Sequence, residues 1–150
     1  MLKHKSGAAI IILSLFISFV FIQSLFFKFT NAPEPQFIFG TINLWAANTL
    51  GLKNLFVPPG IFNQYVIGSF ELIASLLLLL GAFTRFKTFN FYGAFLALCL
   101  MSGAIFFHLF TPLGIDVLND GGTLFYMAIG VWLASAILLF KGRKLFKSKY

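Results

Sequence analysis

Four long apolar stretches dominate the sequence, and the short segments between them contain most of its polar residues. The stretches run from about residue 8 to 29, 65 to 83, 89 to 110 and 123 to 140, and none has an internal proline. Each is close to the roughly 20 residues with which a helix crosses a bilayer core of about 30 Å. The stretches do not alternate as barrel strands do, and lipid requires every backbone group to have an internal partner. The pattern predicts an all-α, integral membrane four-helix bundle.

The composition supports a membrane protein with one compact domain. Hydrophobic residues make up 59% of the 150 residues, charged residues only 10%, and phenylalanine alone contributes 22. A soluble domain of this size cannot hide so much apolar surface. We therefore expect a single transmembrane domain over residues 1–150, in a multi-pass protein of the bacterial inner (plasma) membrane whose main partner is the lipid bilayer.

The basic residues predict the orientation of the chain. Nine of the eleven fall on one side of an up-and-down bundle: Lys3, Lys5, Arg85, Lys87, Lys141, Arg143, Lys144, Lys147 and Lys149. The other side has Lys28 and Lys53 together with three acids. By the positive-inside rule, both termini are predicted to be cytoplasmic. The basic tail is interpreted as a topology signal on anionic lipid, and no nucleic-acid partner is expected because no reading module accompanies it.

The connection between the first two stretches, on the outer side, is long and contains bulky apolar residues. Trp45 suits the interfacial belt, and the segment after "NAPEP" predicts a short interfacial helix on or in the outer leaflet. The sequence "VPPG" at residues 57–60 then breaks the chain. We interpret this connection as a cap on the bundle, with a lid or a partner-docking surface as the alternative. In the second outer connection, Asp120 or Thr123 is expected to cap the last helix.

Glu71 is the one acid within an apolar stretch. An ionisable group at membrane depth faces the protein interior, needs a partner and by default marks a functional site. In an up-and-down bundle, Lys28, Glu71 and His108 come from three helices and converge on the outer half of the membrane. Glu71 is then either half of a structural pair with Lys28 or His108, or a group that handles protons or a ligand. Polar residues toward the same side are secondary candidates: Gln23, Asp116 and Asp120.

Small residues predict which helix faces point inward, because they mark close approach between membrane helices. The predicted inward stripes are Gly68, Glu71 and Ser75 in the second stretch, Gly93, Ala97, Met101, Ala104 and His108 in the third, and Gly130 and Ala134 in the fourth. By contrast, Leu78 and Leu79 are expected to face lipid.

Several kinds of chemistry find no support in the sequence. Cys99 is the only cysteine, so the chain has no internal disulfide and no CxxC redox pair, and Cys99 is interpreted as a small core residue. His4 precedes the first stretch, which leaves only His108 within the membrane and does not suit a bis-histidine haem. No metal constellation, phosphate loop or Ser-His-Asp order is visible.

Four segments follow one another in a characteristic order: "QSLFFKFT" with Lys28, "GSFELIASLLLLLGAFTR" with Glu71, "GAFLALCLMSGAIFFHLF" with His108, and "NDGG" before the last stretch. In this order and spacing, from Gln23 to Phe140, the chain resembles the DoxX family of small four-helix membrane proteins. The resemblance implies the four-helix fold and a redox setting. Related members occur as the membrane subunit of thiosulfate:quinone oxidoreductase, and others associate with soluble oxidative-stress enzymes.

Three functions fit these observations, and whether the chain is an enzyme is left open. In the first, it is a quinone-linked membrane subunit of a redox system, in which Glu71 and His108 bind the head group of a quinone cofactor or exchange its protons. In the second, it is a non-catalytic anchor or accessory subunit whose partner is a soluble redox protein or a second copy. In the third and least favoured, it transports a small solute, although it lacks the internal repeats that support alternating access.

Overall fold

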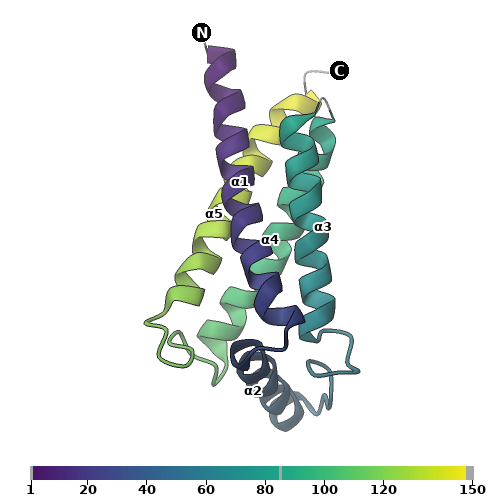
Figure 1. Cartoon of the computed structure of the whole chain (residues 1–150), viewed down its shortest axis with the longest axis vertical. Coiled ribbons are helices and arrows are strands. Elements are labelled where there is room, and N and C mark those ends of the chain that lie inside the picture. Colours follow the sequence, from purple (N-terminus) through teal and green to yellow (C-terminus); the bar gives the residue numbers. More distant parts are fainter. Residues whose placement is uncertain (1, 85, 148–150) are drawn as a thin grey trace.

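The computed structural model describes the backbone of residues 2–84 and 86–147 and the side chains of residues 7–84 and 86–143. This part of the chain has five helices and no strand: α1 (Leu2–Phe29), α2 (Pro33–Leu50), α3 (Gln64–Phe83), α4 (Lys87–Phe110) and α5 (Thr123–Lys147). Figure 1 shows α1, α3, α4 and α5 running up and down beside one another, while α2 lies across one end of them. We call this the α2 end and the opposite one, where both termini lie, the terminal end.

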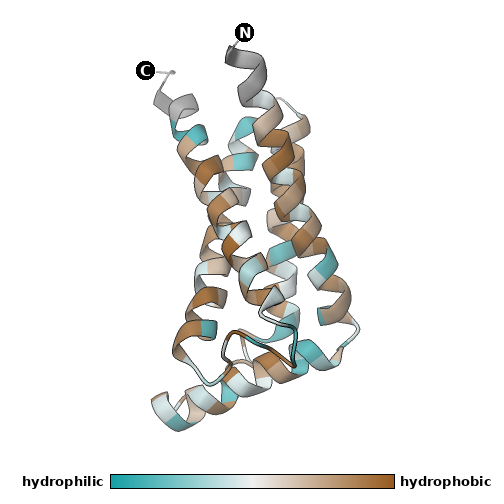
Figure 2. Cartoon of the chain, turned by 90° about the vertical axis from the view of Figure 1, so that its left-hand side faces the viewer, coloured by the Kyte–Doolittle hydropathy of each residue, from teal (hydrophilic) through white to brown (hydrophobic). Residues whose placement is uncertain are grey.

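The four long helices have the length and the surface of membrane spans. The apolar spans are Gly7–Phe29, Gln64–Phe83, Lys87–Phe110 and Thr123–Arg143. Large apolar side chains are exposed along them, among them Ile12, Phe19, Leu80, Phe95 and Phe140. Figure 2 shows apolar residues along the length of these helices and a mixture of polar and apolar residues on α2. The predicted all-α membrane bundle of four helices is confirmed.

Local sequence signals explain where α3 begins and where α2 begins and ends. The Asn63 side chain accepts hydrogen bonds from the backbone N–H groups of Tyr65 and Val66, which starts α3. α2 begins at Pro33, before the segment in which a helix was predicted, because proline lacks an N–H and is well suited to the first helical turn. It ends at Gly51, which has a left-handed φ of 71° and donates its N–H to the Ala46 carbonyl.

The predicted small-residue faces pack at the centre of the bundle. α3 lies against both α1 and α4, and α4 also lies against α5. A Cβ atom added to Gly93 would come within 2.8 Å of the Leu78 backbone nitrogen, and one added to Gly81 would collide with the backbone of Asn90. α3 and α4 are therefore in backbone contact toward the terminal end. The predicted inward faces of α3 and α4 are confirmed by the burial of Gly68, Ser75, Ala97, Met101 and others.

One facing prediction is wrong. Leu78 is fully buried in the core and does not face lipid. The reason lies in the helical period: Gly68, Glu71, Ser75 and Leu78 occur at i, i+3, i+7 and i+10, so Leu78 continues the inward stripe. Leu79, the neighbouring residue, is partly buried.

Buried polar side chains connect the helices toward the terminal end. The Asn90 amide donates to Ser14 Oγ at 2.7 Å and to the Leu78 carbonyl at 3.2 Å, which links α4 to α1 and α3. The Ser18 hydroxyl donates to the Ser75 carbonyl at 3.4 Å. Because lipid cannot satisfy polar groups, such bonds between helices help to fix their register.

The basic residues of the topology prediction are only partly covered by the structure. Lys87, Lys141 and Arg143 lie at helix ends near the terminal end (Figure 1). Arg85 and Lys149 lie outside the described residues, as do the side chains of Lys3, His4, Lys5, Lys144 and Lys147. The cytoplasmic location of this end stays a prediction.

Candidate functional site

The first part of the site is an ion pair between α1 and α3. Ser24 and Lys28 are one helical turn apart, so both point toward the same face of α1, and Glu71 meets them from α3. Gly68, one turn before Glu71, makes this approach feasible. A Cβ atom there would lie 3.1 Å from the Phe29 ring and 3.4 Å from the Lys28 side chain, so a larger residue would push α1 away.

The Ser24–Lys28–Glu71 cluster satisfies nearly all of its own hydrogen-bonding groups. Lys28 Nζ donates to both oxygens of Glu71, at 3.1 Å for Oε1 and 2.9 Å for Oε2, and to Ser24 Oγ at 2.9 Å. The Ser24 hydroxyl lies 2.7 Å from Glu71 Oε2, to which it donates. The ammonium group thus bridges the Glu71 carboxylate and the Ser24 hydroxyl. Glu71 Oε1 accepts only the bond from Lys28 among the described residues, so one of its lone pairs is open to a further donor.

Gln64 holds the α1 end of this cluster in place. Its buried side-chain amide donates to the Lys28 carbonyl at 3.0 Å and to Asn31 Oδ1 at 2.9 Å. The last carbonyls of a helix have no partner within it, so this bond satisfies one of them inside the protein. The backbone that carries Lys28 is thereby attached to the first turn of α3, on which Glu71 stands two turns later.

His108 lies apart from the ion pair. The buried imidazole is 2.6 Å from the Gly114 carbonyl through Nδ1 and packs against the Phe125 ring, with centroids 5.5 Å apart. A carbonyl oxygen can only accept, so Nδ1 carries the hydrogen. Nε2 has no hydrogen-bond partner among the described residues. Of the three residues predicted to converge, the structure therefore brings Lys28 and Glu71 into contact, and His108 contacts the connection to α5 instead.

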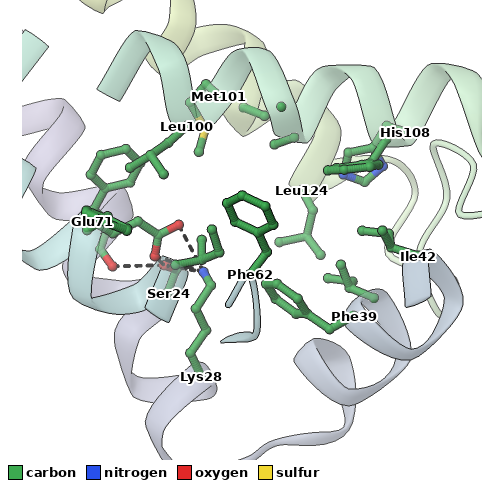
Figure 3. Close-up of a pocket in the computed structure, with 18 of the residues that line it drawn as sticks. Ser24, Lys28, Phe39, Ile42, Phe62, Glu71, Leu100, Met101, His108 and Leu124 are labelled. Atoms are coloured by element: carbon green, nitrogen blue, oxygen red, sulfur yellow. Dashed lines mark hydrogen bonds and ion pairs between the residues drawn. The ribbon is translucent and has the colours of Figure 1, made fainter. Parts of the chain in front are cut away.

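A cavity lies between the ion pair and His108. It has a volume of about 560 Å³, and all five helices contribute to its wall. Figure 3 shows the Ser24–Lys28–Glu71 cluster at one end of the cavity and His108 at the other. Apolar side chains stand between them, including Phe39, Ile42, Phe62, Leu100, Met101 and Leu124. A concave site of this size, with apolar walls and a few polar groups, is typical of small-molecule sites.

Asp120 organises the turn before α5. Its Oδ1 accepts hydrogen bonds from the N–H groups of Val117 and Gly122 at 3.0 and 2.8 Å, and its Oδ2 accepts one from Leu124 at 2.8 Å. Burial by itself would raise the pKa of Asp120, but these three backbone bonds and the nearby His108 together hold it below the ordinary value of 3.8. Of the two capping candidates, Asp120 therefore supplies the cap, and Thr123 donates to its carbonyl.

The other candidates lie outside the polar cluster. Gln23 is exposed and is not among the residues that line the cavity. Asp116 accepts the Gly121 N–H at 2.9 Å and shapes the turn. The interpretation of Cys99 as a core residue is wrong, because this cysteine is exposed at the cavity wall. No three His, Cys, Asp or Glu side chains cluster in the described part of the chain.

Sequence reasoning missed two polar residues of the site. Ser24 could have been predicted, because its i, i+4 spacing to Lys28 places the hydroxyl beside any partner of that lysine. Gln64 gave no comparable signal, since its two partners lie more than 30 residues away in the sequence.

Comparison with models of known protein families identifies the family of the chain. The model of the DoxX family matches residues 9–109. The chain belongs to the DoxX family. The matched range covers most of α1 to α4, with Lys28, Glu71 and His108, whereas Asp116, Asp120 and α5 lie beyond it. No curated protein and no solved structure gives a significant match.

Proposed function

We propose that this DoxX-family protein is the quinone-linked membrane subunit of a redox system and binds a quinol head group at the Ser24–Lys28–Glu71 cluster. The observation that carries the proposal is the cavity between the spans, which has apolar walls and an acid–amine pair at one end. The walls suit a ring and its methyl substituents, while the pair offers groups that can exchange a proton.

The hydrogen bonds of the cluster favour the quinol over the quinone. Lys28 already donates to both Glu71 oxygens and to Ser24, and Glu71 Oε1 has an acceptor position left. A quinol hydroxyl donates and therefore adds to this arrangement, whereas a quinone carbonyl only accepts and cannot use the open position on Glu71 Oε1. Glu71 is the natural acceptor of the hydroxyl proton as the quinol is oxidised.

The full reaction needs a partner. A quinol releases two electrons and two protons when it becomes a quinone. In this proposal Glu71 takes one proton, and His108, whose Nε2 has no hydrogen-bond partner among the described residues, takes the second. The electrons go to a redox protein, because the single cysteine of the chain cannot form a dithiol couple. With the predicted orientation in a bacterial inner membrane, the site lies in the outer half of the bilayer.

Binding of decylubiquinol to the purified protein in lipid nanodiscs tests the proposal. Glu71→Gln should weaken binding by about tenfold or more, because a desolvated charge-assisted hydrogen bond is worth about 1.5–3 kcal/mol. Gln23→Ala, one residue from Ser24 but outside the cavity, is the matched control and should bind like the wild type.

Loss of folding has to be separated from loss of the site. Removing one partner of a buried ion pair can cost about 3–5 kcal/mol, so Glu71→Gln alone should lower the melting temperature. The double variant Glu71→Gln with Lys28→Met leaves no uncompensated charge and should recover much of that stability while still failing to bind. If wild type and double variant bind decylubiquinol equally, or if neither binds it, the proposal is wrong. Absence of binding by an intact wild type favours the anchor function instead.

A further inference from the structure

The cavity has an opening between α3 and α4 that faces the lipid. Two residues that line the cavity, Phe70 on α3 and Cys99 on α4, are exposed, Phe70 by 42%. Both belong to predicted membrane spans that the structure confirms as apolar helices. The edge of the cavity at this place therefore meets hydrocarbon rather than water.

The surroundings of α4 change along its length, from a tight contact with α3 to open space at Gly103. Toward the terminal end the helices touch, since a Cβ atom on Gly93 would lie 2.8 Å from the Leu78 nitrogen. Ten residues later on α4, a Cβ atom on Gly103 would meet nothing within 4 Å, although Gly103 lines the cavity. Small residues usually allow helices to approach closely, and here one stands beside open space.

The neighbouring interface, between α1 and α3, is closed at the same depth in the bundle. α1 and α3 are packed through Gly68, where an added Cβ would lie 3.1 Å from Phe29 and 3.4 Å from Leu25, and Lys28 bridges to Glu71. A ligand whose head group lies at the Ser24–Lys28–Glu71 cluster thus has no room for a long substituent between α1 and α3. Next to Glu71, the gap at Phe70, Cys99 and Gly103 is where such a substituent can leave the cavity.

We propose that the ligand reaches the cavity sideways from the membrane through this gap, and that its hydrocarbon tail occupies the gap in the bound state. The inference rests on the proposed function for the head group and adds that the ligand is a membrane-dissolved molecule with a tail. A water-soluble quinol does not meet this description. Gly103 is without a side chain because the tail passes it, and Cys99 lies at the edge of the route.

Two quinols test the proposal, one with a long tail and one without. Decylubiquinol has a ten-carbon chain, and duroquinol has four methyl groups on its ring. In Gly103→Leu, decylubiquinol should bind about tenfold or more weakly, because the leucine fills the space of the tail, and duroquinol should bind about as in the wild type. Gly40→Leu is the matched control, since Gly40 is also helical, also has open space at its Cβ position and does not line the cavity.

The natural cysteine gives a second readout that requires no substitution. Bound decylubiquinol should slow alkylation of Cys99 by N-ethylmaleimide in nanodiscs by about threefold or more, while duroquinol should leave the rate unchanged. Leu124 on α5 lies at another exposed edge of the cavity. Leu124→Trp narrows the cavity there and tests whether the ligand enters on the α5 side instead.

The outcomes separate this inference from the proposed function. Suppose that decylubiquinol binds in a Glu71-dependent way, that Gly103→Leu binds it like the wild type and that it leaves the alkylation rate of Cys99 unchanged. The gap is then not the route, and the head-group site is retained. The gap is likewise not the route if, of the two variants, only Leu124→Trp weakens the binding of decylubiquinol. If the wild type binds neither quinol, both proposals are wrong. Selective loss of the tailed quinol in Gly103→Leu, with protection of Cys99, supports the gap.

Discussion

Asp120 shows how one carboxylate fixes the geometry at the α2 end. It accepts three backbone hydrogen bonds within the turn before α5, and the nearby His108 also lowers its pKa. His108 in turn is attached to Gly114 in the same connection. The wall of the cavity on this side is therefore held by two side chains that do not themselves contact the ion pair.

The lowered pKa of Asp120 predicts how stability depends on pH. Because the folded state favours the carboxylate, its contribution is complete above the unfolded value near 3.8 and is lost as the pH falls through the lower folded value. Asp120→Asn cannot be protonated in this range, so its melting temperature should fall less than that of the wild type between about pH 5 and pH 3.

Asp116→Asn is the matched control for this prediction, since Asp116 lies in the same turn but accepts a single backbone bond. Thermal unfolding in detergent, measured across that pH range, compares the three proteins. If wild type and Asp120→Asn lose stability in parallel on acidification, the backbone bonds do not stabilise the carboxylate as described.

At the scale of elements, the α3 and α4 pair has a tight contact at one end and forms part of the cavity wall at the other. Toward the terminal end they are in backbone contact through glycines, and toward the α2 end residues of both helices line the cavity. Buried hydrogen bonds from Asn90 strengthen the tight part. A rigid contact at one end of the pair thus supports an open wall at the other.

A series of alanine substitutions tests this difference. Gly81→Ala and Gly93→Ala place a methyl group against backbone atoms of the facing helix and should destabilise the protein by about 1–3 kcal/mol. Gly103→Ala meets no atom and should be neutral, or stabilising by up to about 1 kcal/mol through helix propensity. Melting temperatures of the three variants in detergent give the order, and equal losses at all three positions would contradict the open space at Gly103.

At the scale of the whole molecule, both termini lie at the end opposite α2 (Figure 1). The charge distribution predicts that this terminal end is cytoplasmic and that α2 lies on the outer side. The cavity is nearer to the α2 end, since its walls include Ile38, Phe39 and Ile42 of α2. In the proposed function, the orientation therefore decides which compartment receives the protons that Glu71 and His108 take from the quinol.

Reporter fusions test the orientation. Reporters fused after Lys87 or after Tyr150 should read as cytoplasmic, whereas insertions near Asn48 or Asp116 should read as external, because basic residues flanking the spans are retained inside. An external reading after Tyr150 would reverse the orientation. A cytoplasmic reading at Asn48 together with an external one at Asp116 would instead mean that the chain does not cross the membrane four times.

The sequence by itself determined the class of the fold and the position of the spans. A bilayer imposes a length and an apolar composition on each span, so local pattern is sufficient, and the spacing of Gly68, Glu71 and Ser75 already indicated the inward face of α3. The same spacing, continued by one more turn, would have placed Leu78 inside. The need of Glu71 for a partner also followed from its depth alone.

Only the tertiary structure decided which residues meet. Lys28 and His108 were equal candidates for Glu71, and the choice depended on the close contact of α1 with α3 and on the attachment of His108 to Gly114. The same is true of the cavity, which all five helices line, and of the exposure of Cys99 at its wall. Such features depend on distances between helices, and a sequence specifies these distances only through the sum of many contacts made far apart along the chain.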